Sequence, residues 1–539
     1  MCSVSFNNLS RFKKFLLASA LGLVVLGVIL RLYNVRASGF FFYDEGFYLH
    51  HNLPVLEFIH SHVLRTLDDK ARAAWYYFHS ALGSGKSLWF FIMDSRALWG
   101  GLYDWGFPKL AACFFGLLTI PLVFLFSRRY YGSSLVAITA TALFAVFPGA
   151  VFYSRIGLQE AFSTFLVLGG FYLYIFPRAF GWRTFAAGVV LAAAFFSNYR
   201  LIMLPLSVLV CEFVASRADG RGISWRKYIW FTVVFAACVV GVGNLCNGAN
   251  TTVIAMWVFH QGAVAGGEFA WINFLSYPYY MFRLETWFLA LAFFASAYFL
   301  IQRRWNIAIP LALAFFHMLF FSLPSEKGAR YIAVMFPFIA MGVAFTLKTL
   351  WDVSDDTKRK VLVAFAIVMV AMMSAKAVQL AQASSDHQKV VSYLHLKDPQ
   401  IKFMSSQEMV DDLYVFPHDQ VKPIPPRFED FVALYTKGYR YLVLDPQAYV
   451  SQVEKHKFTV PLRSYLSFID ANVEPVKIFP HMNEALLERF VFEHSENLGV
   501  SVKFLSSEDI QKVASIRVYD LDQPVPLMLR FFEQLKRRQ

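Results

Sequence analysis

Two neighbouring carboxylates, Asp44 and Glu45, lie in the aromatic stretch Phe42–Tyr48, directly after the first long apolar run of the chain. A carboxylate pair at the edge of a membrane is costly unless it is paired, liganded or catalytic. A positioned carboxylate can serve as the general base that takes the proton of an acceptor hydroxyl. Asp44 is therefore the candidate base, and a solvated loop start is the plain structural alternative.

A third carboxylate and five cations extend this candidate site. Glu160 ends the stretch Tyr153–Glu160, and the cations are Lys86, Arg155, Arg200, Lys327 and Arg330. The planar fork of Arg suits a phosphate, so these cations are candidate ligands of a donor phosphate. Glu45 and Glu160 are candidates to orient the acceptor, to hold a divalent cation or to stabilise a cationic sugar in the transition state. Arg155 and Arg200 are also explained by snorkelling toward lipid headgroups.

These residues indicate no particular cofactor, and a divalent cation is the one cofactor that they could bind. His50 and His51 follow the acidic pair by one or two helical turns and could join such an ion. The five cysteines form no cluster of the zinc-binding kind.

The elements that must position these side chains are membrane helices. The chain is 57% hydrophobic and 16% charged, with a mean hydropathy of +0.46, whereas soluble domains carry about 25% charged residues. Apolar runs suited to crossing about 30 Å of hydrocarbon predict eleven transmembrane helices, approximately at Phe15–Leu32, Leu110–Phe126, Leu135–Phe152, Ala161–Phe176, Phe185–Ser197, Leu201–Val214, Ile229–Cys246, Thr286–Ile301, Ile307–Leu323, Tyr331–Leu347 and Val361–Leu380.

The positive charge of the chain predicts the orientation of these helices. The formal net charge is +13, and most of the Lys and Arg residues cluster in alternate loops between the apolar runs. Because basic short loops stay in the cytoplasm, we expect a cytoplasmic N-terminus and an extracytoplasmic C-terminal segment. This distribution marks a multi-pass protein of the cell membrane, in a bacterium the inner membrane, and no nucleic acid partner.

Two domains follow from the change in composition along the chain. Residues 1–380 form the predicted transmembrane domain, and its outer loop 36–107 contains helical patterns typical of helices on the membrane surface. Residues 381–539 alternate polar helical stretches with β-rich runs such as Tyr439–Leu444 and Ser515–Tyr519. This alternation predicts a small extracytoplasmic α/β domain without a catalytic signature of its own.

The order of these motifs resembles the GT-C glycosyltransferases, in particular the family of protein O-mannosyltransferases and bacterial aminoarabinose and related lipid-linked sugar transferases. The resemblance covers roughly residues 15–210 and, more loosely, Pro324–Pro337. It rests on Asp44-Glu45-Gly46-Phe47-Tyr48, Lys86-Ser87-Leu88, Phe107-Pro108-Lys109-Leu110, the basic turn Ser127–Gly132, and Phe147-Pro148 followed by Tyr153–Glu160. The chain departs from the family in having Glu160 where Asp is frequent, Lys86-Ser87-Leu88 where His/Lys-Pro-Pro is frequent, and Arg200 where Lys is frequent.

The resemblance implies a GT-C-like fold and transfer of a sugar from a polyprenyl-phosphate-linked donor to a lipid, glycan or protein acceptor, with inversion at the sugar carbon. Two other classes remain open. A secondary transporter would also be polytopic, but transporters more often contain internal repeats and charged, broken spans near the midplane. A non-catalytic membrane scaffold would account for the outer domain but not for the ordered acidic and basic positions. The glycosyltransferase interpretation is favoured over both.

Overall fold

The computed structural model describes residues 11–51, 86–96, 103–176, 180–220, 222–245, 274–323, 328–415, 419–446, 460–494, 514–522 and 524–527, together with a few further positions between and after them. The described chain is mostly helical, with one small sheet. It divides into two compact units. The first contains residues 1–36 and 52–382, and the second contains residues 37–51 and 383–539. The short segment 37–51, which includes Asp44 and Glu45, therefore belongs with the C-terminal part of the chain.

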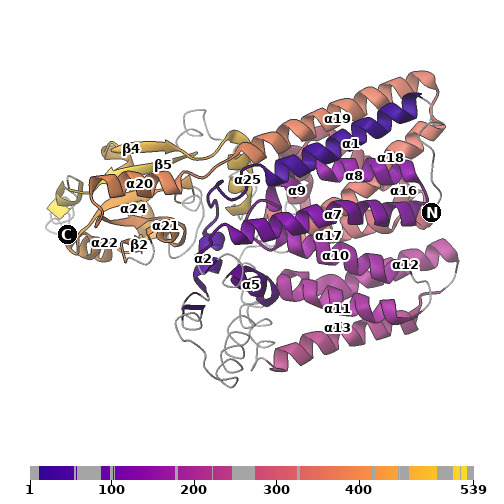
Figure 1. The fold of residues 1–539 in the computed structure, drawn as a ribbon, viewed down its shortest axis with the longest axis horizontal. Helices are drawn as coiled ribbons and strands as arrows, with labels where there is room; N and C mark the ends of the chain where they lie inside the picture. Colours follow the sequence, from indigo (N-terminus) through magenta and orange to yellow (C-terminus); the bar gives the residue numbers. More distant parts are fainter. Residues whose placement is uncertain are drawn as a thin grey trace. The chain divides into compact units, whose positions relative to one another are not determined.

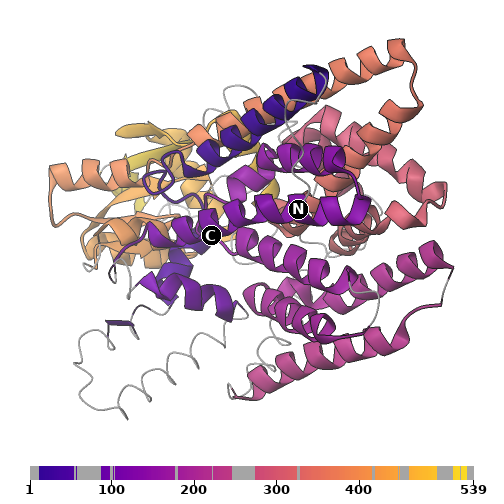
Figure 2. The same ribbon diagram turned by 45° about the vertical axis from the view of Figure 1, so that its right-hand side comes forward.

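The first unit is a bundle of long helices, which Figures 1 and 2 show from two sides. Its elements are α1 (Arg11–Leu32), α5 (Ser87–Asp94), α7 (Phe107–Tyr131), α8 (Ser134–Ala145), α9 (Pro148–Tyr153), α10 (Glu160–Ile175), α11 (Trp182–Ser197), η2 (Tyr199–Met203), α12 (Leu204–Asp219), α13 (Trp225–Leu245), α15 (Ser276–Tyr280), η4 (Met281–Glu285), α16 (Trp287–Ile301), η5 (Trp305–Ile307), α17 (Ile309–Ser322), η6 (Ala329–Met335), α18 (Phe336–Val353) and α19 (Asp356–Gln382).

Each apolar run identified in the sequence coincides with helical structure in this bundle. Four helical segments of the described chain are long and apolar enough to cross a membrane, namely Phe107–Tyr131, Tyr199–Asp219, Ala329–Val353 and Asp356–Lys397. Several other runs form shorter apolar helices. A multi-pass membrane protein is thus confirmed in outline, whereas the predicted number of eleven spans is not. Helices in the expected outer-loop regions 53–67 and 75–82 fall almost entirely outside the described residues.

Close helix packing in the first unit depends on small residues, as is usual in membranes. A Cβ on Gly27 of α1 would lie 2.3 Å from the carbonyl oxygen of Ala145, so only glycine permits this crossing of α1 and α8. The fully buried Arg31 strengthens the crossing, since its guanidinium donates to the carbonyls of Gly27, Ala145 and Phe144. Helix α1 also runs beside α19, where Leu30, Ala377 and Ala381 share an apolar cluster (Figure 1).

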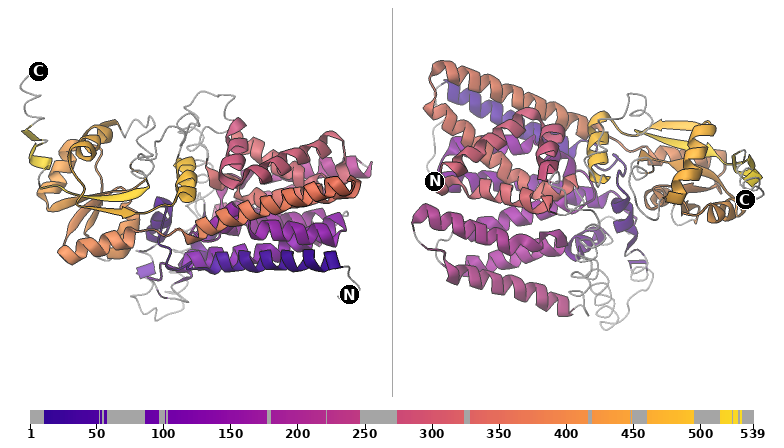
Figure 3. Two further views of the ribbon diagram at one scale, coloured as in Figure 1. Left: turned by 90° about the horizontal axis from the view of Figure 1, so that it is seen from above. Right: turned by 180° about the vertical axis from the view of Figure 1, so that it is seen from behind.

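The second unit is an α/β domain, and its residues from 383 onward are drawn in orange and yellow in Figure 3. Its sheet has the strand order β2-β1-β3-β5-β4, in which β1, β2 and β3 are parallel and β4 and β5 are antiparallel to their neighbours. The elements are α2 (Tyr43–His51), α20 (His387–Lys397), β1 (Lys402–Ser405), α21 (Glu408–Val415), β2 (Val421–Pro423), α22 (Phe428–Thr436), β3 (Tyr439–Leu444), α24 (Val460–Asn472), β4 (Lys477–Pro480), α25 (Glu484–His494) and β5 (Ser515–Asp520).

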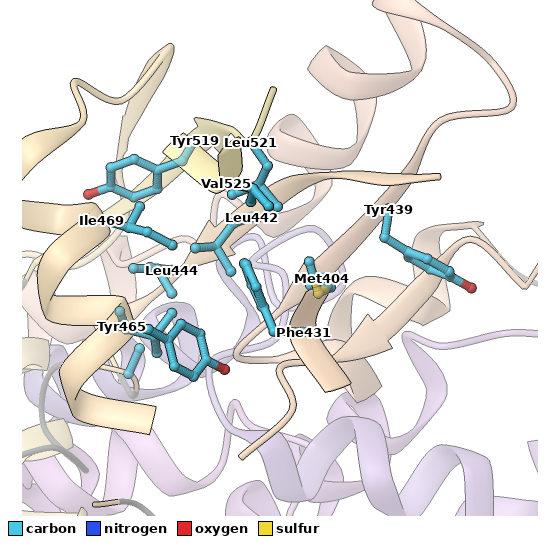
Figure 4. Close-up of a cluster of buried hydrophobic side chains, with 12 residues drawn as sticks. Met404, Phe431, Tyr439, Leu442, Leu444, Tyr465, Ile469, Tyr519, Leu521 and Val525 are labelled. Carbon is cyan, nitrogen blue, oxygen red and sulfur yellow. The ribbon is translucent and has the colours of Figure 1, made fainter. Parts of the chain in front are cut away.

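Two apolar cores, one on each face of the sheet, stabilise this unit. Successive side chains of a strand point to opposite faces, so Leu442 and Leu444 of β3 join one core while Val443 joins the other. Figure 4 shows the first core, in which Phe431 of α22 and Tyr465 of α24 lie below Leu444 and Leu442. The second core receives its helical residues from α20 and α21. The mixed sheet thus lies between helices on both faces.

Candidate functional site

Glu160 is the centre of a charged cluster in the first unit. It begins α10, and only 1% of the residue is exposed. The cations that act on its carboxylate belong to Arg330, Lys86 and Arg200. Neither carboxylate oxygen has a hydrogen-bond partner on another residue of the described ranges. Burial has the largest effect on this carboxylate and disfavours its charge, and the three cations oppose that effect.

Arg200 owes its position to a short helical turn and two aromatic rings. It lies in η2, where Oδ1 of Asn198 accepts a hydrogen bond from the Arg200 backbone N–H at 3.3 Å. The guanidinium carbon lies 4.2 Å from the ring centroid of Tyr331 and 5.3 Å from that of Tyr199. Both distances are within the range of cation–π attraction. Because Tyr331 follows Arg330 in η6, this contact brings two cations of the cluster to neighbouring places.

Lys86 is the cation of the cluster that directly precedes α5. It is the residue before the first turn of α5 and is 8% exposed. Helix α5 is fixed by Trp89, which is fully buried and donates from Nε1 to the carbonyl of Gly157 at 3.3 Å. Its ring also lies 6.0 Å from that of Phe162 on α10. The same contacts therefore hold both Lys86 and the turn that leads into Glu160.

The turn before Glu160 is tightly packed. A Cβ on Gly116 of α7 would lie 2.4 Å from the Cβ of Ser154, so glycine is needed where α7 passes this turn. On the next helical turn, Ser163 shares a 2.9 Å hydrogen bond with Ser197 of α11. These contacts with α7 and α11 hold the turn that leads into Glu160 and the first turn of α10.

Gln159, which sequence reasoning did not single out, is fully buried beside Glu160. Neither its Oε1 nor its Nε2 has a hydrogen-bond partner in the described part of the chain. A buried carboxamide without partners normally costs about 1–3 kcal/mol for an unsatisfied donor or acceptor. The pair Gln159–Glu160 is thus a local concentration of unsatisfied polar atoms next to three cations.

Arg155 has a different environment from the other sequence-predicted cations. One of its terminal nitrogens donates to the carbonyls of Leu30 and Tyr33, and the other donates to Ala381 at 2.7 Å. These carbonyls end α1 and lie in the last turn of α19, where helix carbonyls lack intrahelical partners. Arg155 is 3% exposed and joins the ends of two helices. Its guanidinium is therefore engaged in the structure of the bundle.

Asp44 and Glu45 lie on α2, in the second unit. Oε2 of Glu45 accepts hydrogen bonds from the backbone N–H groups of Phe41 and Phe42, at 2.9 and 3.2 Å. Glu45 thus reaches back to satisfy the residues that lead into its own helix, as in a capping box, and is 1% exposed. The half-buried Asp44 accepts a hydrogen bond from the phenol of Tyr48 at 3.4 Å. The two adjacent carboxylates therefore have different structural roles.

The remaining sequence-predicted residue, Lys327, lies outside the described residues. Within the described ranges, no three His, Cys, Asp or Glu side chains gather in a group that could hold a metal ion. The rings beside Arg200 were also missed by sequence reasoning, although the adjacency of Arg330 and Tyr331, and of Tyr199 and Arg200, was a signal for them.

Comparison with known proteins decides the fold. No family model matches the chain, and no curated protein matches it. Among solved structures, ArnT from Cupriavidus metallidurans in its apo state has a TM-score of 0.54 and 13% identity, covering 87% of this chain and 96% of that chain. The Archaeoglobus fulgidus oligosaccharyltransferase tethered to an acceptor peptide has a TM-score of 0.54 and 11% identity, covering 84% of this chain and 72% of that chain. Both are GT-C proteins.

The chain has the GT-C fold. Two further structures of this fold contain lipid phosphates. One is ArnT from Cupriavidus metallidurans bound to undecaprenyl phosphate, with a TM-score of 0.53 and 13% identity over 82% of this chain and 94% of that chain. The other is AglB from Archaeoglobus fulgidus in complex with an inhibitory peptide and a dolichol-phosphate, with a TM-score of 0.52. At these identities the likeness establishes the GT-C fold of the chain and leaves its substrates to its own residues.

Proposed function

We propose that the protein is a membrane glycosyltransferase that moves a sugar from a polyprenyl-phosphate donor to a hydroxyl of a lipid, glycan or protein acceptor. In the proposed reaction the acceptor oxygen attacks the sugar carbon that carries the phosphate, and a new glycosidic bond forms with inversion. The bond between that carbon and the phosphate oxygen breaks, so the polyprenyl phosphate leaves with the bonding electrons. The acceptor proton passes to a carboxylate of the protein.

One observation carries this proposal: Arg330, Lys86 and Arg200 act together on the buried Glu160. Three cations that act on one buried carboxylate form a basic region, and a basic region suits an anionic ligand. A departing lipid phosphate needs such clamping, and it needs no general acid because it is already a stable anion. The GT-C neighbours with undecaprenyl phosphate and dolichol-phosphate support the same class of ligand.

We assign the clamp to Lys86, Arg200 and Arg330, with Lys327 as a further candidate. Arg200 is suited to this role because the rings of Tyr199 and Tyr331 fix the plane of its guanidinium, and this planar fork matches the geometry of phosphate oxygens. Arg155 is a weaker candidate, since its two terminal nitrogens already donate to backbone carbonyls.

Asp44 is the proposed base, and Glu160 is proposed to stabilise the positive charge that develops on the sugar ring. The hydrogen bonds of Glu45 to Phe41 and Phe42 favour a role in holding the helix of the base rather than in proton transfer. Reaction on the outer face of the membrane, with the N-terminus in the cytoplasm, completes the proposal.

The test is glycosyl transfer by the purified full-length protein from a panel of polyprenyl-phosphate sugars. We expect transfer by the wild type and a loss of roughly 10²- to 10⁴-fold in Asp44→Asn, because a general base contributes that much. Donor binding should persist in this variant. Asp522→Asn is the matched control, since Asp522 forms a solvent-exposed pair with Arg440 in the same unit. Wild-type protein that neither transfers nor hydrolyses any donor, and does not bind the lipid phosphate, would favour a transporter or a scaffold instead.

A further inference from the structure

The helix that carries Asp44 is built into the C-terminal α/β unit rather than into the helical bundle. Residues 37–51 form one compact unit with residues 383–539. Three parts of the C-terminal region contact this segment. The backbone N–H of Ser385 donates to the carbonyl of Ser38 at 2.7 Å. The ring of Phe42 stacks on that of Phe490 of α25 at 5.7 Å. The third and most extensive contact is with α21.

The backbones of α2 and α21 meet at Gly46. A Cβ at this position would lie 2.4 Å from the carbonyl oxygen of Met409 and 2.8 Å from the backbone nitrogen of Val410. Backbone atoms cannot turn aside as the end of a flexible side chain can. Glycine at position 46 is therefore required for the two helices to approach this closely.

Polar contacts fix the rotation of α2 on α21 at both of its ends. At its first residue, the phenol of Tyr43 donates to Oε1 of Glu408 at 3.0 Å. At its other end, Nε2 of His50 lies 3.5 Å from Oδ2 of Asp412. Asp44 lies between these two contacts and directly beside Tyr43. A rotation of α2 about its axis would break both contacts and would also move the Asp44 carboxylate.

The Tyr43–Glu408 bond is partly withdrawn from solvent. Burial raises the pKa of the Tyr43 phenol, and the charge of Glu408 adds to this, so the phenol keeps its proton and acts as the donor. Burial also raises the pKa of Glu408, and the hydrogen bond from Tyr43 opposes that rise. A hydrogen bond to a charged group in such surroundings is worth about twice a neutral one.

We propose that the C-terminal unit is a positioning element for the catalytic base: α21, through Gly46, Tyr43–Glu408 and His50–Asp412, sets the place of Asp44. This inference rests on the proposed function, since it needs Asp44 to act on a substrate. It assigns a role to residues 383–539, in which the sequence contains no catalytic signature. Tyr43, Gly46 and Glu408 are then positioning residues, and none of them contacts the reacting atoms.

The experiment compares kcat with donor affinity in single variants of the full-length protein. Tyr43→Phe removes one oxygen atom and leaves the ring in place. We expect kcat to fall by about 10- to 100-fold, because a displacement of about 1 Å costs a reaction that much. The Kd for undecaprenyl phosphate should stay within about two-fold of the wild type. Gly46→Ala should give the same pattern with a larger loss of kcat.

Two controls separate positioning from general damage. Tyr435→Phe removes another phenol–carboxylate hydrogen bond of the same unit, 3.0 Å long, between Tyr435 and Asp522. It should leave kcat unchanged. Gly22→Ala adds a Cβ in open space on α1 and should be neutral as well. Glu408→Gln keeps an acceptor for Tyr43 and should retain more activity than Glu408→Leu.

The outcomes distinguish this inference from the proposed function. Absence of transfer by the wild type refutes the proposed function itself. Transfer by the wild type together with unchanged kcat in both Tyr43→Phe and Gly46→Ala overturns only the positioning role. A parallel loss of kcat and lipid-phosphate binding, or a loss equal to that of Tyr435→Phe, overturns it too. If Gly46→Ala does not yield folded protein, Tyr43→Phe and the two Glu408 variants decide the question.

Discussion

The unsatisfied carboxamide of Gln159 leads to a prediction in which one substitution raises the stability of the protein and lowers its activity. If Gln159 is retained for a ligand, Gln159→Leu should make the ligand-free protein more stable and the enzyme less active. Leucine has a similar volume and no polar atoms, so it removes the cost of burying unpaired groups without leaving a cavity. A purely structural glutamine would show the reverse effect on stability.

The magnitude follows from the burial of the side chain. Gln159 is fully buried, and both of its polar atoms lack partners in the described part of the chain. An unsatisfied buried donor or acceptor costs about 1–3 kcal/mol, so Gln159→Leu should raise stability by at least about 1 kcal/mol. If the carboxamide hydrogen-bonds a sugar or acceptor hydroxyl beside Glu160, losing that bond costs about 0.5–1.5 kcal/mol, or roughly 2- to 12-fold in kcat/KM.

The assay pairs thermal denaturation in detergent with glycosyl transfer, and Gln420→Leu is the matched control. Gln420 is also buried, but its carboxamide donates to the carbonyl of Pro399 at 3.0 Å and shares a 2.8 Å hydrogen bond with His395. Gln420→Leu should therefore lower the melting temperature. A lower melting temperature for Gln159→Leu as well, or full activity in this variant, would refute the reasoning.

Three further predictions concern the aromatic, ionic and titrating contacts. Tyr331→Leu should weaken undecaprenyl phosphate binding by roughly 5- to 30-fold, because the cation–π contact that orients Arg200 contributes about 1–2 kcal/mol. Tyr331→Phe keeps the ring and should bind undecaprenyl phosphate like the wild type. Equal weakening in both variants would contradict this prediction. Lys227→Met should destabilise the bundle by about 3–5 kcal/mol, because it leaves the buried Glu212, whose Oε1 lies 3.2 Å from the Lys227 ammonium, without this ion-pair partner. The double variant with Glu212→Gln should recover part of the lost melting temperature. No recovery would argue against an unpaired buried charge as the cause. Burial lowers the pKa of His387, but nearby carboxylates outweigh this, above all its buried partner on α21 at 2.7 Å, and the pKa is raised above the ordinary value of about 6.5. The stability that this pair provides is complete below about pH 6.5 and is lost as the pH rises through the higher folded-state pKa. The melting temperature should therefore fall as the pH rises above about 6.5 in the wild type, and it should fall less in His387→Gln.

Local patterns in the sequence identified most of the helices and strands. The β-rich run Tyr439–Leu444 predicted a strand with the bounds that β3 has, and in the structure its buried side chains enter the two cores of the sheet. The predicted helix Leu135–Phe152 is instead two helices, α8 and α9, separated before Pro148. Proline lacks a backbone N–H and restricts the residue before it, so this break was readable from the sequence.

Features that depend on distant parts of the chain were not readable in this way. Arg155 donates to carbonyls 122 to 226 residues away in sequence. Every residue has a backbone carbonyl, so the sequence does not indicate which carbonyls such a side chain binds. The same holds for segment 37–51, which was assigned to the transmembrane domain and lies in the C-terminal unit. Hydropathy identifies the apolar runs, but it does not specify which of the segments between and after these runs fold together.

The discontinuity of the second unit has a consequence for the time course of biosynthesis. Tyr43 and Glu408 are 365 residues apart in sequence, and translation proceeds at about 5–20 residues per second. Helix α2 therefore leaves the ribosome roughly 20 to 70 seconds before its partner helix α21 exists. During that interval the chain already contains its first membrane helices but has no partner for the helix that bears Asp44. The contacts that hold Asp44 under our proposal can therefore form only after α21 has been synthesised.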